Sequence, residues 1–310
     1  MHGPETIETF SCFGGTASVI VMGDGPAGTA AAAAASARRR MLAWDAQFSR
    51  FEEASELSRL NADTRETVAV SVVMARLVSA ILDAARSSGG LVDATLVGEL
   101  ERAGYAGHFD GEPVELELAL RLAPPRSPAG PSPGARWGEV RVDAAAGTVT
   151  RPPGMRFDSG GIAKGLFGDI LAGILGVHAS FAIDCAGDVR VGGSSGLARP
   201  VQVASPFDES FLHVFEVVEG AAATSGIGRR SWLDAGGHPA HHLLDPASGR
   251  PAFTGLVQVT ALAPTALEAE VLAKTALLRG PGGAASTLRH GGVAVDDGGR
   301  AEVIVPASTM

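Results

Sequence analysis

The segment Asp158-Ser159-Gly160-Gly161-Ile162-Ala163-Lys164-Gly165 constrains the fold most strongly, because its glycines and lysine stand where a strand is expected to turn into a helix. Gly160 and Gly161 let the backbone approach an anion closely, and the amphipathic run that follows directs helix N-terminal amides at that anion. Lys164 adds a mobile positive charge. The segment predicts a phosphate site, with a plain turn as the alternative because it matches neither the P-loop nor the dinucleotide fingerprint.

The composition predicts a globular chain with a large core. The 310 residues are 45% hydrophobic and 19% charged, and the net charge of −9 with no basic tract argues against a nucleic-acid partner. The two cysteines, Cys12 and Cys185, lack metal-ligand spacing and are expected in the core. No apolar run reaches membrane-spanning length and no secretory pattern opens the sequence. We therefore expect a cytoplasmic protein with no membrane partner.

The order of the expected elements predicts an α+β fold. An opening strand is expected over Phe10–Met22, a long helix from Pro26 to about Phe51, and a second helix over Thr67–Arg86 that ends at Gly89-Gly90. Further strands are expected at Glu139–Val142, Gly147–Thr150, Ser180–Ile183, Val189–Val191 and Pro200–Ala204. Because these elements follow no regular βαβ repeat, we predict a mixed, largely antiparallel sheet with packed helices.

A Pro-, Gly- and Ser-rich stretch at residues 123–138 is expected to be a surface loop. It contains five prolines, at positions 124, 125, 128, 131 and 133. Its composition fits an idle insertion and a partner-contacting loop equally well.

Four further polar clusters are candidates for site chemistry. They are Ser58–Asn61, Val92–Thr95, Thr224–Gly226 with Arg229-Arg230, and His241–Pro246. In the last cluster, His242 and Asp245 are placed to orient each other, which gives an imidazole able to accept a proton from a hydroxyl near neutral pH. The alternative is that Asp245-Pro246 starts a turn and His242 is a satisfied strand residue.

Taken in order, these clusters resemble the FAD:protein FMN transferase family, also called the ApbE family, over nearly the whole chain. The segments that carry the resemblance are Phe13–Thr16, Ser55–Asn61, Val92–Thr95, Asp158–Gly165, Ala186–Asp188, Ala223–Gly226 and His242–Gly249, in which Ser248 replaces the family's threonine. The resemblance implies one domain over 1–310, with two lobes and the flavin site between them.

The resemblance also implies an activity and its residues. The enzyme cleaves the diphosphate of FAD, attaches FMN by a phosphoester to a Thr or Ser of an acceptor protein, and releases AMP, with Mg²⁺ assisting. His242 is the implied base, oriented by Asp245. The FAD site is implied to contain Asn61, Asp93, Thr95, Gly160, Gly161, Lys164, Asp188, Thr224, Ser225 and Gly226.

The segment Glu268–Ala276 departs from the family pattern Ala-Asp-x-x-x-Thr. Glu270 takes the aspartate place and Lys274 the threonine place, and the resemblance implies the carbonyl of Gly161 as the remaining metal ligand. Thr265 and Glu268 predict a capped helix, which puts Glu270 and Lys274 on one face. Three interpretations stay open: a surface ion pair, an ammonium of Lys274 in place of the metal, or a hydroxyl from Thr275 as ligand.

Two alternative functions follow from this departure. A degenerate relative would bind FAD without transferring FMN, and an FAD diphosphatase would use water as the acceptor and give FMN and AMP. Transfer to a protein hydroxyl is the primary prediction.

Overall fold

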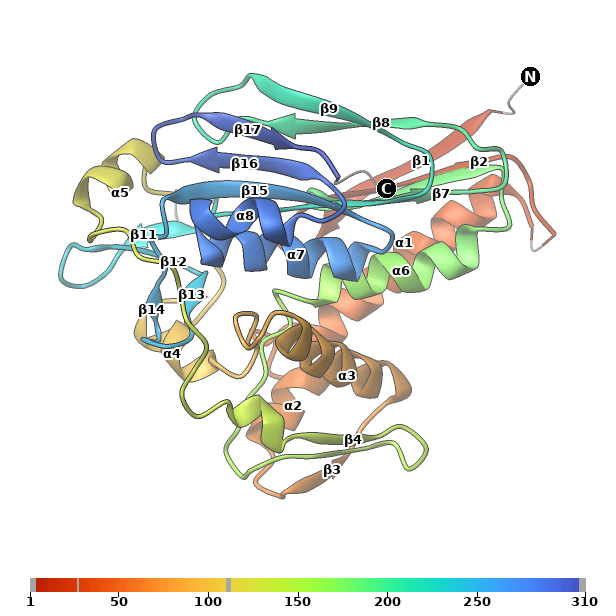
Figure 1. Cartoon of the computed structure of the whole chain (residues 1–310). Coiled ribbons are helices and arrows are strands. Elements are labelled where there is room, and N and C mark those ends of the chain that lie inside the picture. Colours follow the sequence, from red (N-terminus) through yellow and green to blue (C-terminus); the bar gives the residue numbers. More distant parts are fainter. Residues whose placement is uncertain (1–3, 27, 110–112, 307–310) are drawn as a thin grey trace.

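A large antiparallel sheet organises the computed structural model, which describes residues 4–26, 28–109 and 113–306 (Figure 1). The strands lie in the order β1-β2-β6-β7-β10-β15-β16-β17, and every neighbouring pair is antiparallel. Their bounds are β1 (Glu5–Cys12), β2 (Gly15–Met22), β6 (Ser180–Cys185), β7 (Asp188–Gly192), β10 (Gly220–Gly226), β15 (Leu256–Ala263), β16 (Gly292–Asp296) and β17 (Ala301–Ile304).

Three helices form a layer against this sheet (Figure 1). They are α1 (Ala30–Phe48), α6 (Ala163–Leu175) and α7 (Ala266–Arg279). Helix α1 packs against β1 and β2, α6 against β6 and β7, and α7 against β10 and β15. Buried aromatic and aliphatic side chains fill the space between the layers, with Phe167 of α6 stacked on Trp44 and tilted against Phe48 of α1.

The lower part of the molecule in Figure 1 holds α2 (Glu56–Ala62), α3 (Val72–Ser87) and a small sheet. That sheet has the order β3 (Thr67–Ala69), β5 (Thr148–Thr150) and β4 (Arg141–Asp143). Leu57, Leu77 and Val149 belong to the same core cluster as Met41 and Phe167. This core cluster therefore joins the lower part to β1, β2, β6 and the helices α1 and α6, while a second cluster lies between α7 and the strands β10, β15 and β16.

Short elements complete the described residues. They are the helices α4 (Val97–Arg102), α5 (Leu116–Leu122) and α8 (Pro281–Thr287), and the paired strands β8 (Arg199–Ala204) with β9 (Phe211–Val217), β11 (Ser231–Leu233) with β12 (Pro239–His241), and β13 (Leu244–Asp245) with β14 (Arg250–Pro251).

The α+β prediction with a largely antiparallel sheet is confirmed, but several predicted boundaries are wrong. The single strand expected over Phe10–Met22 is the hairpin β1–β2, which turns at Phe13 and Gly14 with φ of 54° and 69°. A type I′ hairpin turn needs positive φ at both central positions, and phenylalanine gives no sequence signal for that conformation. The first long helix begins at Ala30, because the side chain of Thr29 caps it.

The second long helix begins at Val72, because Thr67–Ala69 pairs with β5 as a strand. Its expected end at Gly89-Gly90 is confirmed, since both glycines have positive φ and the Gly90 N–H donates to Ala85 O at 2.7 Å. The segment before Asp158 contains no strand in the described structure, contrary to the expected strand-to-helix turn.

The Pro-rich stretch 123–138 is tied to the body of the protein. The N–H of Ser127 donates to Phe253 O at 3.0 Å and that of Ala129 to Leu278 O at 2.8 Å. Arg126 Nε donates to Asp297 Oδ2 at 2.6 Å. The stretch is therefore an ordered strap that includes a short 3₁₀ turn at Arg136–Glu139.

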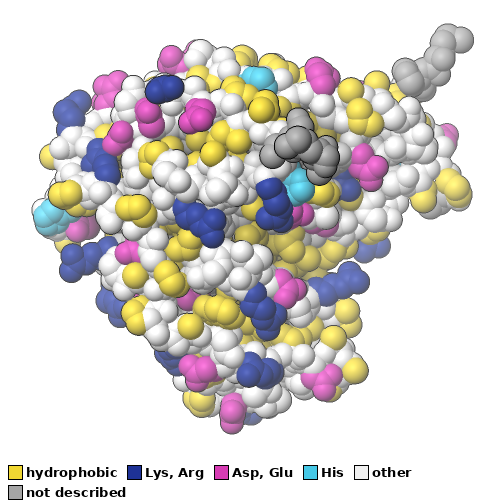
Figure 2. Space-filling model, viewed as in Figure 1, with side chains coloured by type: hydrophobic (Ala, Val, Ile, Leu, Met, Phe, Trp, Pro, Cys, Tyr) yellow, Lys and Arg dark blue, Asp and Glu magenta, His cyan; other side chains and the backbone are white. Residues whose placement is uncertain are grey.

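Charged and hydrophobic side chains are distributed differently over the surface. Acidic and basic side chains are interspersed over the face shown in Figure 2, while hydrophobic side chains gather between the helix layer and the lower part. None of the helices within the described residues has the length and apolar character needed to cross a membrane.

Gly165 sets the distance between α6 and α7, and we expect Gly165→Ala to lower the free energy of unfolding by about 2–3 kcal/mol. A Cβ at Gly165 would lie 2.6 Å from the Leu267 Cα and 2.7 Å from the Ala266 carbonyl oxygen, so the backbone of α7 must shift. Gly173→Ala is the matched control in the same helix, because nothing lies within 4 Å of its added Cβ. We expect it to raise stability by about 0.5–1 kcal/mol. Urea denaturation measures the free energy of unfolding of both variants, and equal changes would contradict the close approach of α6 and α7 at Gly165.

Candidate active site

The turn before α6 is fixed by contacts to two other segments. The backbone N–H of Asp158 donates to Ala94 O at 2.8 Å, and Arg50 Nε donates to Asp158 Oδ1 at 2.9 Å. The hydroxyl of Ser159 donates to Phe48 O at 2.7 Å. The two glycines of the predicted phosphate site therefore sit in a turn held by α1 and by the Val92–Thr95 segment.

Lys164 and Asp188 form an ion pair between the first turn of α6 and the start of β7. Asp188 is only 4% exposed, and its Oδ1 also accepts the backbone N–H of Thr224 at 3.1 Å. Burial works against the charged amine, but the carboxylates of Asp188 and Glu270 raise the pKa of Lys164 above its ordinary value. The amine therefore stays protonated at neutral pH.

A second lysine–carboxylate pair lies beside the first. Lys274 Nζ donates to Gly161 O at 2.8 Å and to Glu270 Oε1 at 3.1 Å. The other carboxylate oxygen, Glu270 Oε2, accepts the N–H of Gly165 at 2.9 Å, so one N-terminal amide of α6 is already bound within the protein. Glu270 is 1% exposed, which excludes the interpretation as a surface ion pair.

These two lysines are the only lysines in the sequence; the other 23 of its 25 basic residues are arginine. Both ammonium groups contact carboxylates around the start of α6. Lysine carries a compact charge on a flexible stem, whereas arginine presents a planar fork. The chain therefore places its two compact cations in one cluster, which we call the lysine cluster: Gly161, Lys164, Asp188, Glu270 and Lys274.

His242 lies at the start of the β12–β13 connection, and the structure makes it a neutral base. Burial holds the pKa of its imidazole well below the ordinary value, and the charge of Arg230, the neighbouring His241 and the Lys274 ammonium lower it further. Its Nδ1 is buried with no hydrogen-bond partner among residues 4–26, 28–109 and 113–306. A neutral imidazole is the form that accepts a proton from a hydroxyl.

Asp245 does not orient His242, contrary to the expectation. Its Oδ1 accepts the N–H of Gly130 at 2.9 Å and that of Ala247 at 3.1 Å. Within the described chain, no hydrogen bond joins the two side chains. Asp245 instead starts the β13–β14 turn and holds the Pro-rich strap, which is the turn alternative considered for Asp245-Pro246.

Asn61, Asp93 and Thr95 act as local braces in this structure. Asn61 Nδ2 donates to Phe157 O at 2.9 Å, and Asn61 Oδ1 accepts the N–H of Phe157 at 2.7 Å. Asp93 Oδ1 accepts both the N–H and the hydroxyl of Thr95, at 2.9 and 2.6 Å. Burial raises the pKa of Asp93. These residues fix the segments that flank the Asp158 turn.

The Thr224–Gly226 segment is the end of β10 rather than a free turn. Thr224 Oγ1 lies 2.8 Å from Thr260 Oγ1 on β15, and its N–H reaches Asp188. Ser225 is buried. The segment therefore connects the lysine cluster to the middle of the sheet.

Two residues near His242 received no predicted role. Arg230 Nη2 donates to Phe13 O at 3.3 Å, and its charge contributes to the low pKa of His242. The ring of Tyr105 lies 6.5 Å from the His242 ring, centroid to centroid. Arg230 was visible in the sequence only as half of a basic pair, and Tyr105 carried no local signal because long-range packing brings it to the site.

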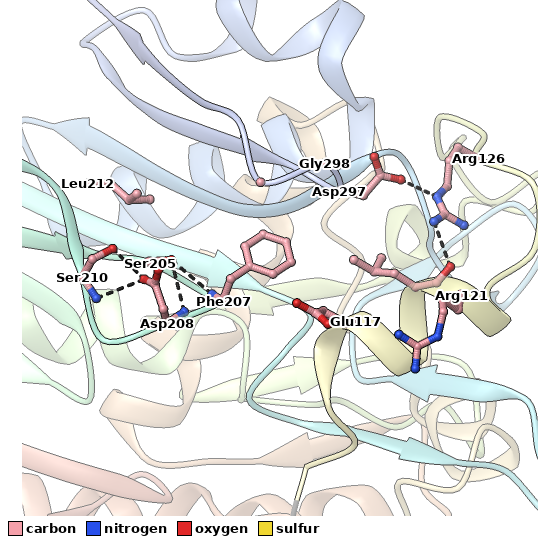
Figure 3. A pocket seen from close by; sticks show the side chains of 12 residues that line it. Glu117, Arg121, Arg126, Ser205, Phe207, Asp208, Ser210, Leu212, Asp297 and Gly298 are labelled. Carbon is pink, nitrogen blue, oxygen red and sulfur yellow. Dashed lines mark hydrogen bonds and ion pairs between the residues drawn. The ribbon is translucent and has the colours of Figure 1, made fainter.

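Two cavities lie apart from the lysine cluster. The first, of about 660 Å³, is lined by α5, the β8–β9 turn and the β16–β17 turn (Figure 3). Among its charged side chains, Arg126 pairs with Asp297, and Asp208 accepts the hydroxyl of Ser210 at 2.6 Å. The second, of about 870 Å³, is lined by α4 and the β13–β14 turn. Neither cavity is lined by a cluster residue.

Comparisons with known proteins agree with this arrangement. The family model described as the ApbE family matches residues 13–295. This chain belongs to the ApbE family. The ApbE protein of Thermotoga maritima has the same fold, with a TM-score of 0.77, 24% identity and 97% coverage of each chain.

Curated relatives of this ApbE chain are distant. The FAD:protein FMN transferase of Klebsiella pneumoniae (strain 342) is 27% identical over 261 residues, which cover 81% of this chain and 72% of that protein. The FAD:protein FMN transferase of Escherichia coli (strain K12) is 28% identical over 148 residues, and in that match the chain spans 42% of the relative's length.

The residues of this ApbE chain do not fit the magnesium site that the resemblance implies. Lys274 Nζ already lies between the Gly161 carbonyl and Glu270, and the hydroxyl of Thr275 donates to Val271 O at 2.7 Å. Thr275 is therefore bound within its own helix, which corrects its expected role as a ligand. No group of three or more His, Cys, Asp or Glu side chains in the described ranges is arranged to hold a metal.

Proposed function

We propose that this chain is an FAD:protein FMN transferase that attaches FMN to a Thr or Ser of an acceptor protein and releases AMP. The observation that carries the proposal is the buried His242 imidazole, whose pKa is held low by burial and by surrounding positive charges that include Lys274. A neutral base together with fixed cations suits attack of a hydroxyl on a diphosphate. Membership of the ApbE family supports the same reaction.

In the proposed step, the hydroxyl oxygen of the acceptor forms a bond to the FMN-side phosphorus as the bond from that phosphorus to the AMP oxygen breaks. The hydroxyl proton passes to His242, and AMP leaves with the electron pair of the broken bond. Lys164 stabilises negative charge on the phosphates because its ammonium stays protonated. No step is assigned to Mg²⁺, because the residues at its expected place do not fit it.

The remaining expectations enter as parts of this proposal. The chain acts as one domain, which the single eight-stranded sheet supports because it runs through both large core clusters. We propose a cytoplasmic location, and Asp245 is left out of the catalytic residues. The proposed FAD site consists of Asn61, Asp93, Thr95, Gly160, Gly161, Lys164, Asp188, Thr224, Ser225 and Gly226.

The test is to incubate the purified chain with FAD and a cell extract that lacks other flavin transferases. We expect AMP release together with flavin fluorescence that stays on a protein band after denaturing electrophoresis, because a phosphoester survives denaturation. Equal release of free FMN and AMP without protein-bound flavin would instead indicate the FAD diphosphatase. Bound but intact FAD would favour the degenerate relative and contradict the proposal.

A further inference from the structure

The ammonium of Lys274 sits among oxygens that would otherwise attract a metal ion. It lies 2.8 Å from the Gly161 carbonyl oxygen and 3.1 Å from Glu270 Oε1. These are hydrogen-bond distances, longer than the roughly 2.1 Å that Mg²⁺ requires. By position in the family pattern, these two oxygens are metal ligands, so the lysine fills the place of the cation.

The rest of the lysine cluster keeps the ammonium in this place. Glu270 is buried, and its second oxygen accepts the N–H of Gly165, so removal of Lys274 would leave the carboxylate without the cation that is hydrogen-bonded to it. A Cβ at Gly161 would lie 3.0 Å from Lys274 Cε, so the glycine leaves room for the lysine stem in this position. A divalent cation that entered here would meet a like charge at contact distance.

One hydrogen of the ammonium remains for a ligand. Lysine carries three donors, and the described protein accepts two of them, at Gly161 and Glu270. The side chain of Lys274 is 13% exposed, so solvent reaches it.

We propose that Lys274 is a tethered cation that replaces the divalent metal, so that this chain cleaves the FAD diphosphate without Mg²⁺. The proposal rests on the proposed transferase function. As the acceptor oxygen bonds to phosphorus and the bond to AMP breaks, the third N–H of Lys274 donates to a diphosphate oxygen. The proton of the acceptor still passes to His242, and no electron transfer is involved.

The first test measures metal binding and needs no turnover. Mn²⁺, as a paramagnetic substitute for Mg²⁺, is titrated into the full chain with FAD present, and free Mn²⁺ is followed by electron paramagnetic resonance. We expect the unaltered chain and the control Arg279→Met, which loses an exposed positive charge on α7, to bind it weakly. Lys274→Thr should bind Mn²⁺ at least about 10-fold more tightly, since the family's threonine and an unpaired Glu270 are then present. Tight binding by the unaltered chain would overturn the proposal.

The second test measures AMP release with a chelator or with Mg²⁺. The rate of AMP release by the unaltered chain should differ by less than about 2-fold between chelator and Mg²⁺. The rate of Lys274→Thr should be about 10²-fold lower in chelator and should recover when Mg²⁺ is added. Since Lys274→Met leaves Glu270 buried without its cation, the variant Glu270→Gln/Lys274→Met serves as the folded inactive form.

The outcomes separate this inference from the proposed function. A strict Mg²⁺ requirement of the unaltered chain overturns the tethered cation and leaves the transferase proposal standing. Absence of AMP in every condition sinks the transferase proposal, and the Mn²⁺ titration then still decides whether Lys274 excludes a metal.

Discussion

His242→Ala is expected to lower the rate of FMN transfer by about 10²–10⁴-fold while FAD affinity changes by less than about 3-fold. The imidazole takes the proton of the acceptor hydroxyl in the proposed step, and it contributes no charge to the binding of FAD because it is neutral. Transfer is measured as protein-bound flavin fluorescence and affinity as quenching of free FAD fluorescence. His238→Ala is the matched control, since its side chain is 77% exposed and should change the rate by less than about 2-fold. A larger loss of FAD affinity than of rate would contradict the role as a base.

The pH dependence gives an independent readout of the same residue. An ordinary histidine has a pKa of about 6.5 and is mostly protonated at pH 6, which would stop it from accepting a proton. Burial and the nearby positive charges lower the pKa of His242 in the folded protein, so the base form persists as pH falls. We expect the transfer rate to stay level from pH 8 to pH 6. A rate that falls with an apparent pKa near 6.5 would contradict the low pKa.

Local sequence rules predicted the parts of the site that depend on neighbours along the chain. The hydroxyl of Thr265 caps α7 by accepting the N–H of Glu268 at 3.2 Å, as expected from their spacing. One turn further on, Glu270 and Lys274 face each other at 3.1 Å. Helical periodicity alone fixes such pairs, so the sequence is sufficient to predict them.

The features of the fold and the site that were not predicted depend on contacts between segments far apart in the sequence. Asp245 is bound to Gly130 through the Pro-rich strap, and composition cannot show that this strap crosses the β13–β14 turn. Thr67–Ala69 was predicted as helix, but it is a strand because it pairs with β5, about 80 residues later in the sequence. Arg230 Nη2 likewise donates to Phe13 O, which lies 217 positions away in the sequence. Pairing over such separations follows from the tertiary fold and leaves no local pattern.

Lys164→Met is expected to cut AMP release by about 10²–10³-fold and to lower the free energy of unfolding by about 3–5 kcal/mol. The substitution removes a charge from the phosphate site and leaves Asp188, 4% exposed, as a buried carboxylate without a cation. Asp188→Asn alone should also destabilise, because Lys164 then loses its closest counter-charge.

The variant Lys164→Met/Asp188→Asn separates the two roles of the pair. A neutral amide and a thioether leave no buried charge uncompensated, so most of the lost stability should return. The asparagine oxygen can still accept the Thr224 N–H that reaches Asp188 Oδ1 at 3.1 Å, which keeps β7 and β10 connected. AMP release should stay as low as in Lys164→Met, because no cation has been restored to the diphosphate. Urea denaturation and AMP quantification on the same preparations measure the stabilising role and the catalytic role separately. A double variant that regains both stability and AMP release would show that the pair only supports the fold.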